Sequence, residues 1–209
     1  VPVEGASNVI GDRAYGHDPE TVGAMGEAAA EGLKSGGVLP VMKHVPGHGR
    51  GMADSHHELP VVTTPLTELQ AYDFPPFRRL HKELMAMSAH VVYTAIDAER
   101  PASTSRKVID EIIRGFIGFD GLLMSDDVSM NALKGSIGER AAAIVAGGGD
   151  VVLHCNGLMD EMRAVAAEVP LLASKARARA DAVEAAFGTV DAAEEVAIRA
   201  EFDGLRATA

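Results

Sequence analysis

Residues 36–57 have the sequence GGVLPVMKHVPGHGRGMADSHH. The first seven residues form a short apolar run of the kind that makes a buried strand. One proline and three glycines follow (positions 46, 47, 49 and 51), and they can neither extend a strand nor begin a stable helix. The segment therefore predicts a strand whose carboxyl end presents Lys43 and His44, followed by a mobile glycine-rich loop that carries Asp54 and His56.

This segment also concentrates side chains that can do chemistry. Four of the eight histidines lie within residues 43–57, together with a lysine and the Asp-x-His pair of Asp54 and His56. Ligands of parallel α/β proteins bind at the carboxyl ends of strands and in the loops that follow them. Loop histidines can also be merely solvated polar residues, but the clustering of these groups favours a functional site.

Outward from this segment, short apolar runs alternate with helical stretches. Predicted strands cover residues 38–43, 84–89, 121–125 and 150–154. Predicted helices cover residues 20–34, 67–83 with an interruption near Pro75, 105–115, 139–146, 158–168 and 172–187. A strand, loop and helix repeated four times predicts right-handed βαβ units and a parallel sheet.

Polar residues follow every predicted strand, which favours an α/β fold of the (β/α)8 TIM-type barrel over a doubly wound sheet. A complete barrel typically takes about 250 residues, and only four strands are evident. We therefore expect the C-terminal portion of a barrel, with the early strands absent from this chain; miscounted strands in the helical tail are the alternative. Residues 1–209 are expected to form a single domain, with a helical tail over residues 188–209.

Composition excludes several function classes. The formal net charge of −11 argues against a nucleic-acid partner. No apolar run is long enough to span a bilayer, and no signal peptide is evident, although the chain has no initiator methionine. The single cysteine, Cys155, rules out an internal disulfide and fits a reducing compartment.

Asp126 is the strongest candidate for covalent chemistry. It follows the apolar run of residues 121–125, and a carboxylate at the end of a rigid strand is fixed in space, as an attacking group must be. Asp127, directly after it, is expected to support Asp126; the alternative is that one of the two caps the next helix.

His56 can move protons near neutral pH, and Asp54 could orient its imidazole and support the protonated form. Lys43 and His44 are placed to donate hydrogen bonds to hydroxyls or a carboxylate of a ligand. For Lys43, a structural ion pair with a nearby acid is the alternative.

Three classes of function fit these residues. The first is a glycosidase with an aspartate nucleophile and a loop-borne acid/base. The second is a metal hydrolase in which His44, His48, His56 and Asp54 bind a zinc-like ion, although their spacing matches neither H-x-H nor H-E-x-x-H. The third is a non-catalytic fragment that needs a partner to fold.

Four stretches resemble one known family. Residues 43–60, KHVPGHGRGMADSHHELP, resemble the K-H-F-P-G-H-G-x4-D-S-H signature of glycoside hydrolase family 3 β-N-acetylglucosaminidases (β-hexosaminidases) of the peptidoglycan-recycling type. Residues 8–19 (NVIGDRAYGHDP) resemble its I-G-x-R-x-x-x-x-D-P segment. Residues 89–93 (AHVVY) with Asp97 and residues 101–103 (PAS), and then residues 118–130 (GFDGLLMSDDVSM), resemble its remaining motifs in the family's order.

The resemblance implies a bacterial, cytoplasmic, retaining glycosidase that removes terminal β-linked N-acetylglucosamine from cell-wall fragments. It implies that Asp126 is the nucleophile, that His56 is the general acid/base, and that Asp54 is its dyad partner. It assigns substrate binding to Arg13, Lys43 and His44, and it implies no cofactor and no metal.

Two departures from the family pattern have consequences. Val45 replaces the usual aromatic residue of the signature, which is a mild change in packing. The family's segment before the first motif has no counterpart in this chain. A barrel without its early strands has open sheet edges, so we expect self-association of the isolated chain.

Overall fold

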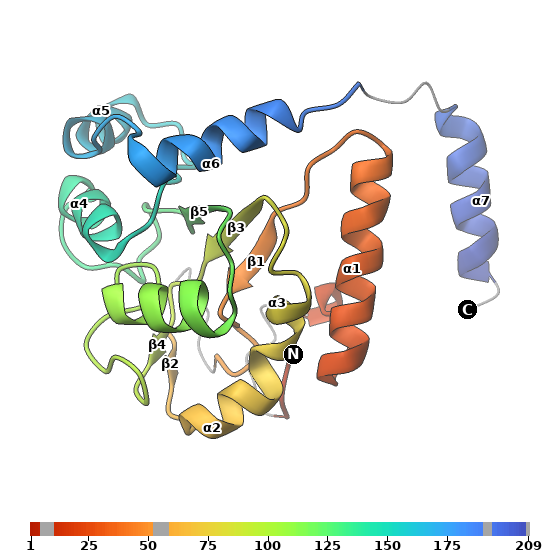
Figure 1. Ribbon diagram of the computed structural model, residues 1–209, viewed down its shortest axis with the longest axis horizontal. Helices are drawn as coiled ribbons and strands as arrows, with labels where there is room; N and C mark the ends of the chain where they lie inside the picture. The colour runs from red at the N-terminus through yellow and green to blue at the C-terminus, as the bar shows by residue number, and fades with distance from the viewer. Residues whose placement is uncertain (5–10, 52–58, 190–193, 208–209) are drawn as a thin grey trace.

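The computed structural model describes residues 1–4, 11–51, 59–189 and 194–207. A parallel three-stranded sheet lies at its centre, in the order β1 (Met42–Val45), β3 (Met85–Ser88) and β5 (Leu122–Ser125) (Figure 1). A second parallel sheet pairs β2 (Val61–Val62) with β4 (Val92–Tyr93). The predicted α/β fold with parallel strands is confirmed, and the carboxyl ends of β1, β3 and β5 share one edge.

Helices surround the larger sheet, with α1 on one side and α4 and α5 on the other (Figure 1). α1 packs against α3, and α4 packs against α5. The helical elements are η1 (Gly11–Arg13), α1 (Pro19–Ser35), α2 (Leu66–Glu68), η2 (Leu69–Asp73), α3 (Pro75–Arg79), η3 (Val108–Phe116), α4 (Ile137–Gly147), α5 (Met159–Glu168), α6 (Ser174–Ala185) and α7 (Glu195–Ala207).

Local signals explain where these helices begin and end. The Asp18 side chain accepts a hydrogen bond from the Thr21 amide (2.8 Å) and Pro19 occupies the first turn, so α1 begins where the sequence predicted. α4 starts with a capping box of Ser136 and Glu139 and ends at Gly148, whose φ of 105° suits glycine. The predicted interruption near residue 75 is also observed, because η2 ends at Asp73 and α3 begins at Pro75.

Two predicted strands differ from the structure. The strand predicted over residues 38–43 begins only at Met42, because Pro40 has no amide hydrogen to donate and restricts the residue before it. The segment predicted as a strand over residues 150–154 forms a single bridge, between Val151 and Met124. It still lies beside β5, where the Ser125 amide donates to the Val151 carbonyl (3.0 Å). The described strands form open sheets, so the barrel prediction is confirmed only as a parallel α/β arrangement.

The main core lies between the three-stranded sheet and the helices that cover it. It contains the apolar side chains of β1, β3, β5 and η3 together with Phe74, Tyr93 and Phe119. Tyr93 and Phe74 are fully or almost fully buried, at 2% and 0% exposure. This core fixes the strands whose carboxyl ends carry the candidate site.

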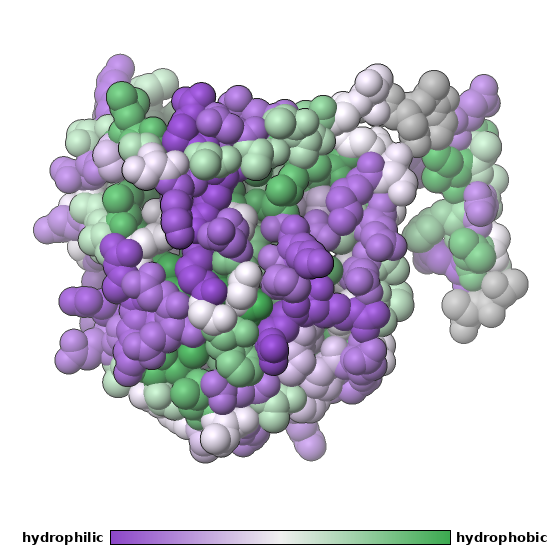
Figure 2. All heavy atoms as spheres, viewed as in Figure 1, coloured by the Kyte–Doolittle hydropathy of each residue, from purple (hydrophilic) through white to green (hydrophobic). Residues whose placement is uncertain are grey.

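The C-terminal region is less well packed. α7 stands apart from the rest of the molecule (Figure 1), and apolar side chains are exposed along it (Figure 2). They are Val196, Ile198, Phe202 and Leu205. Among the described residues, no helix is both long and apolar enough to cross a membrane.

Candidate functional site

Asp126 lies directly after β5, at the shared carboxyl edge of the sheet. Its amide donates to the Ser88 carbonyl of β3 (3.2 Å), which extends the strand pairing to the candidate nucleophile itself. Its carboxylate Oδ1 accepts from the Asp127 amide (2.9 Å), and Oδ2 lies 3.7 Å from His44 Nε2. The sheet therefore fixes the backbone of Asp126, and the adjoining turn fixes one of its carboxylate oxygens.

Asp127 is held by the turn that follows β5. Its carboxylate accepts from the Ser129 hydroxyl (2.6 Å), the Ser129 amide (3.0 Å) and the Cys155 amide (3.2 Å). Although partial burial raises it, these hydrogen bonds hold the pKa of Asp127 below its ordinary value. Asp127 does not cap the next helix, because Ser136 caps α4. Its carboxylate is committed to ordering the chain around Asp126.

His44 lies on β1, across β3 from Asp126, and its side chain is 20% exposed. Burial lowers the pKa of His44 to about 4; the Asp126 carboxylate opposes this shift and Lys43 adds to it. At neutral pH the imidazole is thus uncharged, and its 3.7 Å approach to Asp126 is not an ion pair. A neutral imidazole can still donate a hydrogen bond to a ligand.

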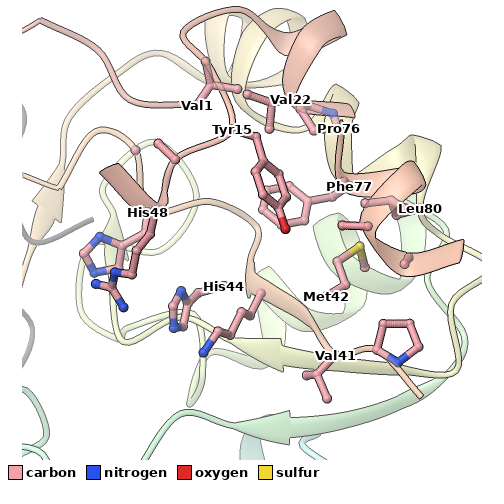
Figure 3. Close-up of a pocket in the computed structure, with 18 of the residues that line it drawn as sticks. Val1, Tyr15, Val22, Val41, Met42, His44, His48, Pro76, Phe77 and Leu80 are labelled. Carbon is pink, nitrogen blue, oxygen red and sulfur yellow. The ribbon is translucent and has the colours of Figure 1, made fainter. Parts of the chain in front are cut away.

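A cavity of about 340 Å³ adjoins this edge, between α1, β1 and α3. Arg13, Lys43 and His44, which the sequence predicted to bind substrate, all line it, together with His48. Figure 3 shows His44 and His48 on one side of the cavity and Met42, Phe77 and Leu80 on the other, with the Tyr15 ring between them. Asp126 is not part of the lining, and His44 connects it to the cavity.

Side chains of β4 and η2 contact the first part of the loop after β1. The Tyr93 hydroxyl donates to the Gly47 carbonyl, and the Nε–H of Arg50 is shared between the two carboxylate oxygens of Asp73 in η2 (3.0 and 2.8 Å). Asp54 and His56 belong to residues 52–58, which lie outside the described residues. The structure therefore describes the first part of this loop, as far as Gly51, and the Arg50 contacts hold that part.

The structure describes two of the four residues that the metal-site alternative requires, His44 and His48. The rings of His44 and His48 lie edge to face, with centroids 5.9 Å apart. The other two proposed ligands, Asp54 and His56, are outside the described segments. Within those segments, no group of three or more His, Cys, Asp or Glu side chains is arranged to hold a metal ion.

The sequence motifs assign no role to His90, which the structure places against the Asp127 backbone. The His90 side chain is fully buried, and its two ring nitrogens contact the Ser103 hydroxyl (2.7 Å) and the Asp127 carbonyl (3.1 Å). His90 and Ser103 lie in the stretches of residues 89–93 and 101–103, so the signal for them was present in the sequence. Asp97, from the same region, accepts from the Ser105 hydroxyl (2.6 Å) and from two backbone amides, as a turn-forming residue does.

A family model described as "Glycosyl hydrolase family 3 N terminal domain" matches residues 1–187. The beta-hexosaminidase of Bordetella avium is 42% identical over 156 residues, which cover 73% of this chain and 44% of that relative. This chain spans about half the length of the curated relatives it matches.

Solved structures share the fold. A family 3 β-N-acetylglucosaminidase from Paenibacillus superposes with a TM-score of 0.82 at 28% identity, covering 93% of this chain and 41% of that one. NagZ from Neisseria gonorrhoeae, in complex with N-trifluoroacetyl-D-glucosamine, superposes with a TM-score of 0.77 at 32% identity. That match covers 95% of this chain and 56% of NagZ.

Proposed function

The chain belongs to glycosyl hydrolase family 3, and on that premise we propose that the protein is a retaining β-N-acetylhexosaminidase. One observation carries the proposal: the Asp126 carboxylate is fixed at the edge of the sheet, 3.7 Å from His44, which lines the adjoining cavity. The names of the Bordetella relative and of the NagZ complex support a substrate that carries N-acetylglucosamine. A cavity of about 340 Å³ is within the size range of small-molecule sites.

In this mechanism, Asp126 Oδ2 attacks the anomeric carbon of the terminal sugar and the glycosidic C–O bond breaks. His56 donates a proton to the departing oxygen, and Asp54 stabilises the imidazolium form before that transfer. In the second step, neutral His56 takes a proton from water, and the resulting attack releases the sugar and frees Asp126. Most glycosidases use two carboxylates, so a histidine acid/base is a departure from the general scheme.

Three hydrogen-bond donors are assigned to substrate binding, namely the cationic side chains of Arg13 and Lys43 and the neutral ring of His44. Arg13 and Lys43 lie in the cavity wall and offer charged N–H groups to hydroxyls or to a carboxylate. Neutral His44 offers one N–H beside Asp126, where it can bond a sugar hydroxyl without competing as a cation for the nucleophile. The hydrophobic side of the cavity, with Met42 and Phe77, suits the apolar face of a sugar ring or its N-acetyl group.

We propose that residues 1–209 form one domain and that their sheet is the C-terminal portion of a (β/α)8 barrel. The physiological substrates would be N-acetylglucosaminyl fragments of peptidoglycan, released for recycling in the cytoplasm. Exposed apolar side chains, among them Phe187 and Leu171, give the isolated chain a route to self-association.

The nucleophile is the decisive test. In the full natural protein, Asp126→Ala should lower the hydrolysis of an aryl N-acetyl-β-glucosaminide by several orders of magnitude, because covalent catalysis is removed. A 2-fluoro sugar that traps the glycosyl-enzyme should label Asp126, as mass spectrometry of the digested protein would detect. Labelling of Asp127 or Asp97 instead would overturn the assignment.

A chelation experiment separates this proposal from the metal-dependent alternative. Activity should survive exhaustive treatment with EDTA, because no step above uses a metal. Loss of activity that returns when zinc is added would favour the histidine cluster of His44, His48, His56 and Asp54 as a metal centre and would refute the glycosidase mechanism.

A further inference from the structure

His90 is a fully buried titratable side chain near the candidate site, and the mechanism above does not use it. It follows β3, on the stretch that leads into β4, and its side chain has no exposure to solvent. Burying a polar ring costs free energy unless its nitrogens are hydrogen-bonded. Both nitrogens of His90 are satisfied, by Ser103 on one side and by the Asp127 carbonyl on the other.

The two partners fix the tautomer of the ring. A backbone carbonyl can only accept, so Nε2 of His90 carries the hydrogen and donates to the Asp127 oxygen (3.1 Å). Burial lowers the pKa of His90, which keeps the ring neutral although the Asp126 carboxylate opposes the shift. Nδ1 of the neutral ring is then an acceptor, and the Ser103 hydroxyl donates to it (2.7 Å).

The hydrogen bond from His90 reaches the residue that holds the nucleophile. The Asp127 amide donates to Asp126 Oδ1 (2.9 Å), and the carbonyl of the same residue accepts from His90 (3.1 Å). The Met130 amide also donates to that carbonyl (3.1 Å). Residue 127 is thus clamped at its amide, its carbonyl and its side chain, and a rotation of this unit would move the donor that aligns the Asp126 carboxylate.

We propose that His90, oriented by Ser103, is a positioning residue for Asp126: its Nε2–H holds the Asp127 backbone so that the Asp127 amide aligns the attacking carboxylate. This inference rests on the proposed function, in which Asp126 is the nucleophile. A misplacement of about 1 Å at a reacting group can lower a rate by about a hundredfold. His90 and Ser103 act on Asp126 only through Asp127 and touch no reacting atom, so neither residue is catalytic.

Two substitutions at one position separate hydrogen bonding from packing. His90→Gln places an amide N–H near the position of Nε2, whereas the shorter side chain of His90→Asn reaches only about as far as Nδ1. We expect the rate of trapping by the 2-fluoro sugar to fall about tenfold in H90Q and about a hundredfold in H90N. The concentration dependence of trapping should change little, because Arg13, Lys43 and His44 still bind the sugar.

The leaving group gives a second readout, which separates a loss of nucleophile alignment from a loss of the general acid. Attack by Asp126 is needed whichever group departs, so the His90 variants should lose similar factors in turnover with activated and with unactivated glycosides. Loss of a general acid behaves differently, since it mainly slows substrates with poor leaving groups.

Ser103 and Ser105 supply a matched control. Both serines are fully buried and lie two residues apart, but the Ser105 hydroxyl donates to Asp97 (2.6 Å) and accepts from the Val108 amide (3.1 Å), away from Asp126. Ser103→Ala should slow trapping about fivefold, because the orientation of the His90 ring is no longer fixed. Ser105→Ala should lower the melting temperature and leave the trapping rate of the folded protein unchanged.

The outcomes are distinct when all variants are made in the full natural protein. Equal trapping rates for H90Q, H90N and wild type at matched folded concentration would overturn the positioning role while leaving the proposed function intact. Identical trapping rates for S103A and S105A would overturn it as well. A wild-type protein that neither hydrolyses the aryl glycoside nor is trapped would refute the proposed function, and the role of His90 would fall with it.

Discussion

The carboxyl ends of β5 and β1 lie on the same edge of one sheet, two strand positions apart, yet they are held in different ways. At β5, Asp126 is fixed by hydrogen bonds from its own sheet and from the adjoining turn, through Ser88 and Asp127. At β1, the chain leaves the sheet after Val45, and its loop is held by side chains from other elements, Tyr93 and Asp73.

The difference follows from what each end is proposed to do. A nucleophile gains from a fixed position, because the rate of attack depends on alignment within a fraction of an ångström. An acid/base on a loop can move over a bound substrate and away for product release. The structure describes the β5 end of this arrangement in full and the loop after β1 up to Gly51.

The largest expected effect concerns the loop after β1, which carries the proposed acid/base His56. His56→Ala should reduce the hydrolysis of substrates with poor leaving groups by about a hundredfold to ten-thousandfold, the range of general acid catalysis. Activated aryl glycosides should lose far less, because a good leaving group departs without a proton. Steady-state rates over a series of aryl glycosides of increasing phenol pKa would measure the difference.

Asp54→Asn serves as the graded control, since it leaves the imidazole present but less basic and less well oriented. It should show a weaker form of the same leaving-group dependence, and added azide should partly restore turnover of His56→Ala with an activated substrate. Equal losses across all leaving groups in both variants would remove the contrast between the two strand ends. The acid would then have to be another group at this edge.

The next effect concerns the stem of the loop. Arg50 pairs with Asp73, whose side chain is 5% exposed, and with Glu68 (2.8 Å). Arg50→Ala leaves the Asp73 carboxylate buried without this partner and should lower the free energy of unfolding by about 3 kcal/mol. Denaturant titration followed by circular dichroism would measure the change.

Arg79 provides the control arginine, because it also pairs with two carboxylates, Glu20 and Glu27, but at the surface. Its replacement by alanine should cost much less, since exposed ion pairs contribute little. If Arg50→Ala and Arg79→Ala are equally mild, the β1 loop stem is not held by its buried ion pair. A double variant, Arg50→Met with Asp73→Leu, should recover part of the lost stability if the penalty is the uncompensated charge.

Local patterns in the sequence predicted most of the helices and the parallel strands. Asp18 and Pro19 mark the start of α1 through a side-chain cap and a fixed φ, and both effects act within one turn. β1 begins later than the apolar run of residues 38–43 predicts, because Pro40 lies inside that run and has no amide hydrogen to donate. Residues 150–154 have the composition of a strand, but only Val151 bridges to β5.

The site was predicted less completely, for a physical reason. Asp126 and His44 are recognisable because strand ends collect functional side chains. The contacts of His90 with Ser103 and the Asp127 carbonyl join residues 13 and 37 positions apart, and no periodicity reports such a contact. The pairing of Arg50 with Asp73, 23 residues apart, is of the same kind.

The smallest effect we predict tests whether the His44 ring, at the carboxyl edge of the sheet, is shielded from water. His44 is neutral in the folded protein, with a pKa of about 4 instead of the ordinary 6.5, because burial disfavours the charged ring. The pKa of the deeply buried His90 is lowered for the same reason. Between about pH 6.5 and pH 4 the unfolded chain therefore binds protons that the folded protein does not, and stability should fall as the pH falls through that window.

The stability that comes from keeping His44 neutral is fully present above about pH 6.5 and is lost progressively towards pH 4. His44→Gln keeps a neutral polar side chain and cannot take up the proton, so its melting temperature should fall less than that of wild type between pH 7 and pH 4.5. Scanning calorimetry over this range would measure the two slopes. Identical slopes would mean that water or a carboxylate already solvates the His44 ring. The carboxyl end of β1 would then be open to solvent. The two strand ends would then differ in hydration as well as in anchoring.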